Sequence, residues 1–475
     1  MFKARQKILL SVLCLTSMPL LAQSDADYVA QFVQQHQTRN IELAQNMWNW
    51  AEVRFHEDKS SQAMQQMLSA QGFTVHAGVA GMPTAFVASY GSTGPVIGIL
   101  AEMDALPGLS QQATPQQQAI EGKQAGHACG HHLFGAGSVA AAITVKNWLE
   151  QNKINGQVRL YGTPAEEGGS GKVYMVRDGL FKDVDIVLHW HAGDRNNAQA
   201  MTTLANKTAK FRFHGIASHA AAAPELGRSA LDAVEAMDYM VNMMREHVPS
   251  ETRIHYVITN GGSVPNVVPE FAEVYYYLRT PSAADLPELW TRLEKTAQAA
   301  ALGTGTTVEQ EIMSGVWSVL PNSTLAKVTY DSMQHYGGLN YTSEEKQFAD
   351  KIRPSLSKRA QKRIGAEQQI DPWTDEIYAS SASTDVGDVS WNVPTVGFVT
   401  ATWVPGTPPH SWQAVAAGGM SIGYKGMQLA IKTLALSAIT LYQQPQLIEA
   451  AKQEWLQRKG DVQYQSQIGD RQPAL

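Results

Sequence analysis

Residues 96–108, with the sequence VIGILAEMDALPG, contain the feature that decides the fold. The first part of this stretch, VIGILA, is an unbroken apolar run, and such runs are typical of strands buried on both faces of a parallel sheet. Similar runs recur in QVRLYGT (157–163) and DIVLH (185–189), with helical patterns between them. This alternation predicts an α/β fold in which helices sandwich a mostly parallel sheet.

The flanking sequence supplies the other elements of such a fold. Apolar spacing predicts helices over 27–70, 137–150, 171–180 and 420–443, and strands over 86–90 and within 382–400. Residues 343–380 are polar and charged, which indicates a surface insertion.

A different pattern begins near residue 203. Strands are expected at 207–215, 255–260, 270–279 and 307–313, and helices at 227–247 and 284–302. The order strand, helix, strand, strand, helix, strand is that of a ferredoxin-like α+β unit, which can close on itself. We therefore predict that residues 207–318 form an inserted domain, and that 25–206 and 319–475 together form the α/β domain.

The composition excludes several classes of protein. The chain has 475 residues, a formal charge of −6 and 2 cysteines, which argues against nucleic-acid binding through a basic face and against a disulfide scaffold. Basic residues followed by the apolar run 8–22 predict that residues 1–24 are a cleaved signal peptide, hence a periplasmic or secreted protein without stable membrane insertion. The alternative is an uncleaved anchor. Cleavage would remove Cys14 and leave Cys129 as the only thiol.

Unusual polar residues follow the predicted strands, where ligands bind in open parallel sheets. Strand alternation puts Glu102 and Asp104 on one side of the first strand end. Two acids so close repel each other unless a positive group lies beside them, and an exposed pair is the alternative. In GHACGHH (126–132), Cys129 lies among three histidines, a set that suits Zn and also Mn or Ni. The alternative there is a buried Cys beside solvent-facing histidines.

Further candidate ligands follow the other strands. In PAEEGG (164–169), one of Glu166 and Glu167 could ligate a metal while the other acts as a base on metal-bound water, although adjacent acids are common on surfaces. His189 and His191 share one strand face, and His410 lies in a Pro-rich loop. Each of these histidines alone is more often structural. Together with Cys129 and Asp104, however, the set could hold two divalent ions and activate water for amide hydrolysis.

The motifs taken together resemble a known family. EMDALPG, GHACGHH, GTPAEEGG, LHWHAG, HGIASHAAAAPELGRSALDAVE, PNVVP, STDVGDVSW and GTPPHSW are similar to motifs of the aminoacylase/carboxypeptidase-type dinuclear metallopeptidases, which include auxin-conjugate and hippurate hydrolases. The likeness covers most of residues 30–440. It implies a hydrolase of amide bonds in N-acyl or N-aroyl amino acids, with two divalent ions, Mn or Zn, per subunit.

The resemblance also implies roles for residues of the α/β domain. Cys129, His131, Glu167 and His410 match metal ligands, Glu166 matches the base that activates water, and Asp104 matches a catalytic-site aspartate. The last ligand is ambiguous, because the Leu-His-x-x-Pro pattern of much of the family points to His189. Trp-His-Pro, the pattern of the aminobenzoyl-glutamate hydrolases, points to His191, which we expect to be the ligand.

In the inserted domain, which the resemblance identifies as a lid, His219 matches a histidine that polarises the scissile carbonyl, often in the partner subunit's site. Asn266 and Arg279 match substrate-binding positions, although Arg279 could be a surface charge. A homodimer through the lid is implied, and a related second subunit is a further possible partner. The alternatives are a metal-dependent dipeptidase and a non-catalytic periplasmic protein that binds peptide or metal. A binder has no use for a base beside a ligand, which disfavours the last alternative.

Overall fold

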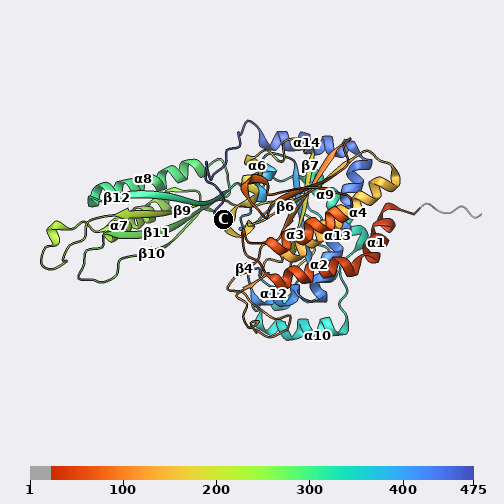
Figure 1. Ribbon diagram of the computed structural model, residues 1–475, viewed down its shortest axis with the longest axis horizontal. Coiled ribbons are helices and arrows are strands. Elements are labelled where there is room, and N and C mark those ends of the chain that lie inside the picture. Colours follow the sequence, from red (N-terminus) through yellow and green to blue (C-terminus); the bar gives the residue numbers. More distant parts are fainter. Residues whose placement is uncertain (1–22) are drawn as a thin grey trace, which may run out of the picture.

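A computed structural model of the chain, drawn in Figure 1, describes residues 23–475. The signal-peptide prediction falls on residues 1–22, outside this range. The figure shows a rounded larger domain and an elongated second domain that projects from it to the left. Among the described residues, no helix is both long enough and apolar enough to cross a membrane.

A six-stranded sheet in the order β1-β2-β6-β3-β7-β14 lies at the centre of the larger domain. The strands are β1 (Thr74–Ala77), β2 (Phe86–Tyr90), β6 (Gln157–Thr163), β3 (Val96–Glu102), β7 (Ile186–Gly193) and β14 (Thr395–Ala401). The last four in this spatial order pair in parallel, whereas β1 and β2 are antiparallel. Every residue of β3 is buried, so the predicted mostly parallel, two-sided sheet is confirmed.

Helices cover this sheet (Figure 1). They are α1 (Asp25–Gln35), α2 (Gln37–Trp50), α3 (Asp58–Ala70), α4 (His131–Asn152), α6 (Gly171–Arg177), α9 (Ser323–Tyr336), α10 (Ser343–Ile352), α11 (Val386–Ser390), α12 (Trp412–Gly418), α13 (Ser421–Gln443) and α14 (Pro445–Lys459). The helical pattern predicted over 27–70 is therefore three helices. Ala51 and Phe55, with φ of 47° and 63°, break it between α2 and α3, because left-handed backbone cannot continue a right-handed helix.

The second domain, the lid, contains β9 (Ala205–His214), α7 (Ala230–Met244), β10 (Arg253–Asn260), β11 (Phe271–Thr280), α8 (Leu286–Thr304) and β12 (Thr307–Val316). Its antiparallel sheet has the order β10-β11-β9-β12, which is the ferredoxin-like arrangement predicted from the sequence. The lid has a hydrophobic core separate from that of the larger domain, with Phe211, Tyr276 and Trp290 among its buried residues.

Shorter elements complete the fold. They are η1 (Val79–Gly81), β4 (Leu106–Pro107), β5 (Ala125–Gly126), α5 (Glu166–Gly169), β8 (Met201–Thr202), η2 (Pro224–Leu226), η3 (Arg245–His247), η4 (Arg353–Ser355), η5 (Ala360–Lys362), η6 (Ala366–Gln368) and β13 (Tyr378–Ala379). The polar stretch 343–380 is more than a surface insertion, because Phe348, Ile352 and Leu356 are buried in a small cluster with Trp403.

Asp388, on α11, ties the end of the lid to the larger domain. The Trp317 N–H, just after β12, donates to Asp388 Oδ2 at 3.0 Å, and the Tyr464 hydroxyl donates to Oδ1 at 2.7 Å. Burial raises the pKa of Asp388 from 3.8 to about 7, despite these two donors.

Asp388 should therefore make stability pH-dependent. A raised pKa in the folded state favours the protonated carboxyl, so its contribution is fully present below pH 3.8 and is lost as the pH rises towards about 7. We expect Asp388→Asn to remove this loss, so that the variant gains free energy of unfolding relative to the wild type as the pH rises. Urea titrations at a series of pH values measure the difference. Parallel profiles for the two proteins would contradict the assignment.

Candidate metal centre

The candidate site lies at the carboxyl ends of β3, β6 and β7. Glu102 is the last residue of β3, Glu166 and Glu167 come soon after the end of β6, and His191 lies near the end of β7. These strands pair in parallel, so their ends share one edge of the sheet.

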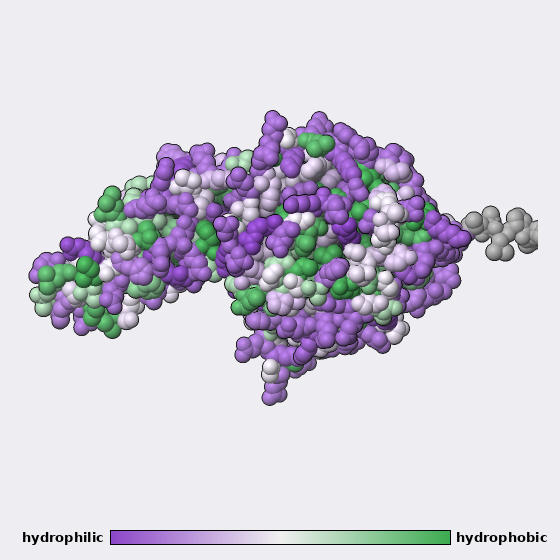
Figure 2. Space-filling view, turned by 45° about the horizontal axis from the view of Figure 1, so that its top comes forward, coloured by the Kyte–Doolittle hydropathy of each residue, from purple (hydrophilic) through white to green (hydrophobic). Residues whose placement is uncertain are grey.

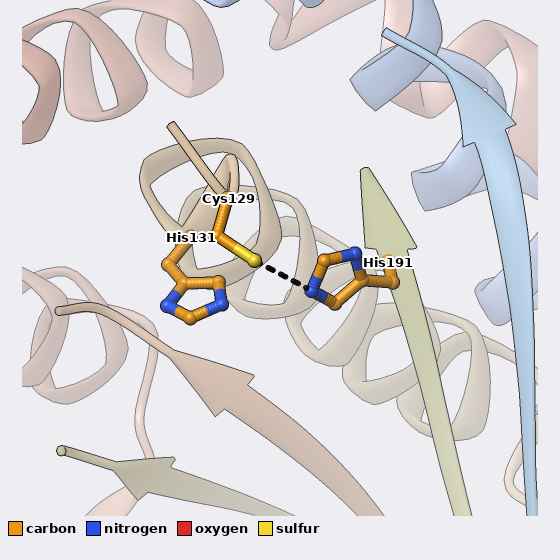
Figure 3. A group of neighbouring side chains, drawn as sticks. All are labelled: Cys129, His131 and His191. Carbon is orange, nitrogen blue, oxygen red and sulfur yellow. Dashed lines mark hydrogen bonds between the residues drawn. The ribbon is translucent and has the colours of Figure 1, made fainter. Parts of the chain in front are cut away.

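The turn before α4 brings Cys129 to this edge. Gly130, at the start of the helix, has φ of 80°, and a Cβ placed there would lie 2.3 Å from the Ala192 Cβ, so only glycine fits. The turn places Cys129 Sγ 3.6 Å from His191 Nε2, as Figure 3 shows, with the His131 ring beside them.

Two sets of donor atoms share the Cys129 sulfur. One set is Cys129, His131 and His191, the other is Cys129, Glu167 and His410, and the atoms of each set lie within 4.8 Å of one another. Thiolate, imidazole and carboxylate donors suit a divalent ion such as Zn²⁺. Two of these potential ligand atoms also face a further polar side chain, since His131 Nε2 lies 3.0 Å from Glu102 Oε2 and Glu167 Oε1 lies 3.1 Å from His410 Nε2. The residues therefore fit a metal centre.

His410 reaches the site from a strained loop. Its φ is 57°, its N–H donates to the Ala128 carbonyl at 3.0 Å, and its Nε2 lies 3.1 Å from Glu167 Oε1. Non-glycine residues with positive φ need support from their surroundings and cluster at functional sites. Here the bond to Ala128 ties the loop to the Cys129 turn.

The other histidines predicted near the site lie elsewhere. His189, the alternative to His191, packs against Gly397 of β14, and burial lowers its pKa to about 4. His132 Nε2 bonds the Gly418 carbonyl at 3.0 Å, and His127 Nε2 bonds the Met47 carbonyl at 3.1 Å. These three histidines are absent from the donor sets found in residues 23–475.

Asp104 lies behind the donors rather than among them. Its Oδ1 is 2.9 Å from His131 Nδ1, and its Oδ2 accepts the Glu167 N–H at 2.8 Å. A carboxylate that holds one imidazole nitrogen fixes the ring and leaves the other nitrogen for a metal. Asp104 thus orients a candidate ligand and anchors the Glu167 backbone.

A buried charge network supports the site and was not predicted from the sequence. The Lys172 ammonium lies 2.6 Å from Glu102 Oε1 and 2.7 Å from Asp385 Oδ1, and all three side chains are at most 2% exposed. Burial disfavours the charge of Glu102, but Lys172 and His131 outweigh this effect and lower its pKa to about 2. The sequence signal was a lysine directly before the apolar run 173–176 of the short helix α6. Its partner Asp385 lies within the STDVGDVSW motif.

The pKa values of the adjacent residues Glu166 and Glu167 are shifted in opposite directions. Burial, together with the charges of Glu102 and Glu167, raises the pKa of Glu166 well above its ordinary value. Burial also acts to raise the pKa of Glu167, but the hydrogen bond with His410 and the charge of His131 lower it overall. Carboxylates whose pKa values are pushed apart in this way are suited to different roles.

The three predicted site residues of the lid lie at opposite ends of it. β11 starts beside the outer end of β9 and returns to the larger domain, so Arg279 pairs with Asn206 near the junction. His219 and Asn266 lie in loops at the opposite end, where a bridge joins His219 to Val267. β9 has 10 residues and so spans roughly 30 Å. The structure therefore does not bring His219 or Asn266 to Glu166 of the same chain (Figure 1).

The donor set could hold divalent ions, which activate water in metal-dependent hydrolases. The chain matches peptidase family M20/M25/M40 over residues 98–410 and belongs to that family. This match makes it a metal-dependent hydrolase of amide bonds and confirms the resemblance predicted from the motifs.

Three relatives illustrate the match. A subunit of the p-aminobenzoyl-glutamate hydrolase of Escherichia coli (strain K12) is 41% identical, over 90% of this chain and 94% of that protein. The Xaa-Arg dipeptidase of Mus musculus is 29% identical, over 87% and 88%. A crystal structure of a dinuclear metal binding peptidase of the M20 family from Bacillus subtilis has a TM-score of 0.59 and 17% identity, over 86% and 99%. This last likeness supports the fold.

The two histidines of β7 give a direct test of the donor set. We expect His191→Ala to weaken metal affinity at least about tenfold. Loss of a residue that only orients a ligand already costs about this much, and loss of the ligand itself should cost more. His189→Ala is the matched control and should change affinity by less than about twofold. Competition titration of Zn²⁺ or Mn²⁺ against a chelator measures both variants. The reverse order would show that His189 is the ligand.

Proposed function

We propose that this protein hydrolyses the amide bond of N-acyl or N-aroyl amino acids, such as aminobenzoyl-glutamate, with two divalent ions, Mn or Zn, per subunit. The observation that carries the proposal is the convergence of the two donor sets on Cys129 next to Glu166. The name of the Escherichia coli relative supports the substrate class, and that of the Bacillus subtilis peptidase supports two ions.

Each residue of the site has a distinct part in this reaction. Divalent ions held by Cys129, His131, His191, Glu167 and His410 would supply a polarised carbonyl and a more acidic water. Glu166 lies beside these ligands, where it accepts a proton from the attacking water and passes it to the leaving amine. Asp104 keeps the His131 ring in place through its contact with Nδ1.

Removal of the base should separate catalysis from metal binding. We expect Glu166→Gln to lower kcat by about 10²–10⁴-fold, the usual contribution of a general base, while the metal content stays that of the wild type. Hydrolysis of aminobenzoyl-glutamate followed by mass spectrometry, together with elemental analysis, measures both. A variant that keeps both its metal and its rate would exclude Glu166 as the base.

A metal-dependent dipeptidase is the second candidate, supported by the 29% identity to the Xaa-Arg dipeptidase. A dipeptidase must bind a free substrate amine, which an acylated substrate lacks. Assays of matched acylated and free dipeptides decide between the two functions. Cleavage confined to free dipeptides would favour the dipeptidase.

We also propose that the protein is exported, which the basic residues followed by the apolar run 8–22 support.

We further propose that the protein acts as a homodimer through the lid. Seven of the eight residues of β10, an edge strand, are exposed, and free strand edges pair with other strands. Figure 2 shows hydrophobic residues gathered at the far end of the lid. Ile216, Leu226, Val264 and Val267 are exposed there, in the loops that carry His219 and Asn266. A partner subunit would cover this surface and receive His219 in its own site, where the imidazole would stabilise the oxyanion.

Mixed dimers test this arrangement. Neither Glu166→Gln nor His219→Ala should be active alone. If His219 acts in the partner's site, random mixing of the two variants restores one working site in each mixed dimer, or about a quarter of wild-type activity. The control is the same mixture before the subunits exchange.

If His219 acted within its own chain, no mixture would recover activity. The mass of the complex, measured by light scattering, distinguishes a homodimer from a monomer that requires a related second subunit. The possibility of such a partner is supported by the Escherichia coli relative, which is named as one subunit of its hydrolase.

A further inference from the structure

Residues 51–57, between α2 and α3, pack against the turn that carries Glu166 and Glu167. The Glu52 carbonyl accepts the Ala105 N–H at 2.7 Å, which ties the segment to the end of β3. Glu57 Oε1 accepts the Ala165 N–H at 2.9 Å, just before Glu166. A segment fixed at these two points has a defined position beside the candidate catalytic acids.

Phe55 holds the middle of this segment. Its φ is 63°, and a Cβ built on Gly169 would lie 3.0 Å from the Phe55 ring. Such backbone strain persists only when surrounding contacts hold it, and it marks functional sites.

Arg54, next to Phe55, lies beside the turn that carries Glu166 and Glu167. A Cβ placed on Gly168 would lie 3.0 Å from Arg54 Nη1, and Gly168 directly follows Glu167. The Arg54 side chain is exposed, and within residues 23–475 it forms neither a hydrogen bond nor an ion pair. The backbone of this segment is held by its contacts, and the Arg54 guanidinium beside the candidate metal ligands is available to bind another group.

The nearby acids of the same segment have other partners. The Glu52 carboxylate accepts the N–H groups of Lys59 and Ser60 at 3.0 and 2.9 Å. The Glu57 carboxyl accepts the Thr84 hydroxyl at 2.9 Å, in addition to the Ala165 N–H. Neither residue neutralises Arg54.

The lid contributes a second cation and an aromatic ring near its junction with the larger domain. Tyr277 and Arg279 alternate along β11 with Tyr276 and Leu278, which are buried in the lid core, so the first two face away from that core. The Arg279 guanidinium lies 5.7 Å from the centre of the Tyr277 ring. Arg279 pairs with Asn206 near the start of β9, so this end of the lid adjoins the larger domain.

We propose that Arg54 binds the side-chain carboxylate of the amino acid that the enzyme releases, and so makes the enzyme selective for N-acyl derivatives of dicarboxylic amino acids. This inference rests on the proposed function and deepens it. The planar guanidinium donates two parallel hydrogen bonds to a carboxylate and stays charged at any working pH. In this arrangement Arg279, near the junction of the lid with the larger domain, binds the α-carboxylate of the same amino acid.

Two substrates that differ only at the side-chain carboxylate test this assignment. The probes are aminobenzoyl-glutamate and aminobenzoyl-glutamine, assayed with the metal-loaded wild type, Arg54→Gln and Lys59→Gln. Lys59 is the matched control, because it is an exposed positive charge close in sequence to Arg54, and its side chain has no described contact with Gly168.

We expect Arg54→Gln to lower kcat/KM for the glutamate substrate about tenfold or more, as the loss of a charge-assisted pair requires. The glutamine substrate should change by less than about twofold, and Lys59→Gln should change neither by more than that. Equal losses on both substrates, or no loss on either, would overturn the proposal.

Binding gives a separate measurement. Calorimetric titration of both probes into Glu166→Gln, with and without Arg54→Gln, reports affinity in the absence of turnover. The same selective loss of the glutamate probe is expected, and an unselective result overturns the role of Arg54. If the wild type cleaves neither probe, the proposed function fails, while this titration still decides whether Arg54 binds the carboxylate.

Discussion

The arrangement of the site depends on compensation of buried negative charge at the end of β3. Glu102, Asp104 and Asp385 are at most 1% exposed, and Glu166 and Glu167 lie beside them. Lys172 joins Glu102 to Asp385, and His131 contacts both Glu102 and Asp104. A buried ion pair gives little net stability, but the loss of one partner leaves an uncompensated charge and typically costs about 3–5 kcal/mol. The network therefore specifies the geometry of the ligands more than it adds to stability.

Much of this could be predicted from the sequence, because the relevant signals are local. Apolar runs predicted the strands of the central sheet, polar residues just after several of them suggested candidate donors, and the resemblance assigned their roles. The repulsion expected between Glu102 and Asp104 called for a nearby positive group, but Lys172 and Asp385 lie 213 positions apart, and no local pattern joins them. The resemblance favoured His191 over His189, although both lie on one strand face. The structure adds a physical reason, because the missing side chain at Gly397 leaves room for the His189 ring against β14.

The lid shows the same division between local and long-range information. Its order of strands and helices follows from periodicity, and its motif histidine, His219, was found by resemblance. The distance between that histidine and Glu166 depends on the length and direction of β9, which carries the loop away from the larger domain. Likewise, nothing in Ala51 or Phe55 as residue types indicates left-handed backbone, because that conformation is imposed by the contacts of the segment.

The Cys129 sulfur is common to both donor sets, and this has a consequence for oxidative damage. Conversion of the thiolate to a sulfinic acid is irreversible in most proteins and would remove a donor from both sets at once. The described chain contains no second cysteine that could form a disulfide with a sulfenic acid and so allow its reduction. Two successive oxidations by peroxide, through a sulfenic acid, would therefore damage both donor sets together, and neither set would remain intact alone. Bound metal, by occupying the sulfur, would also protect it.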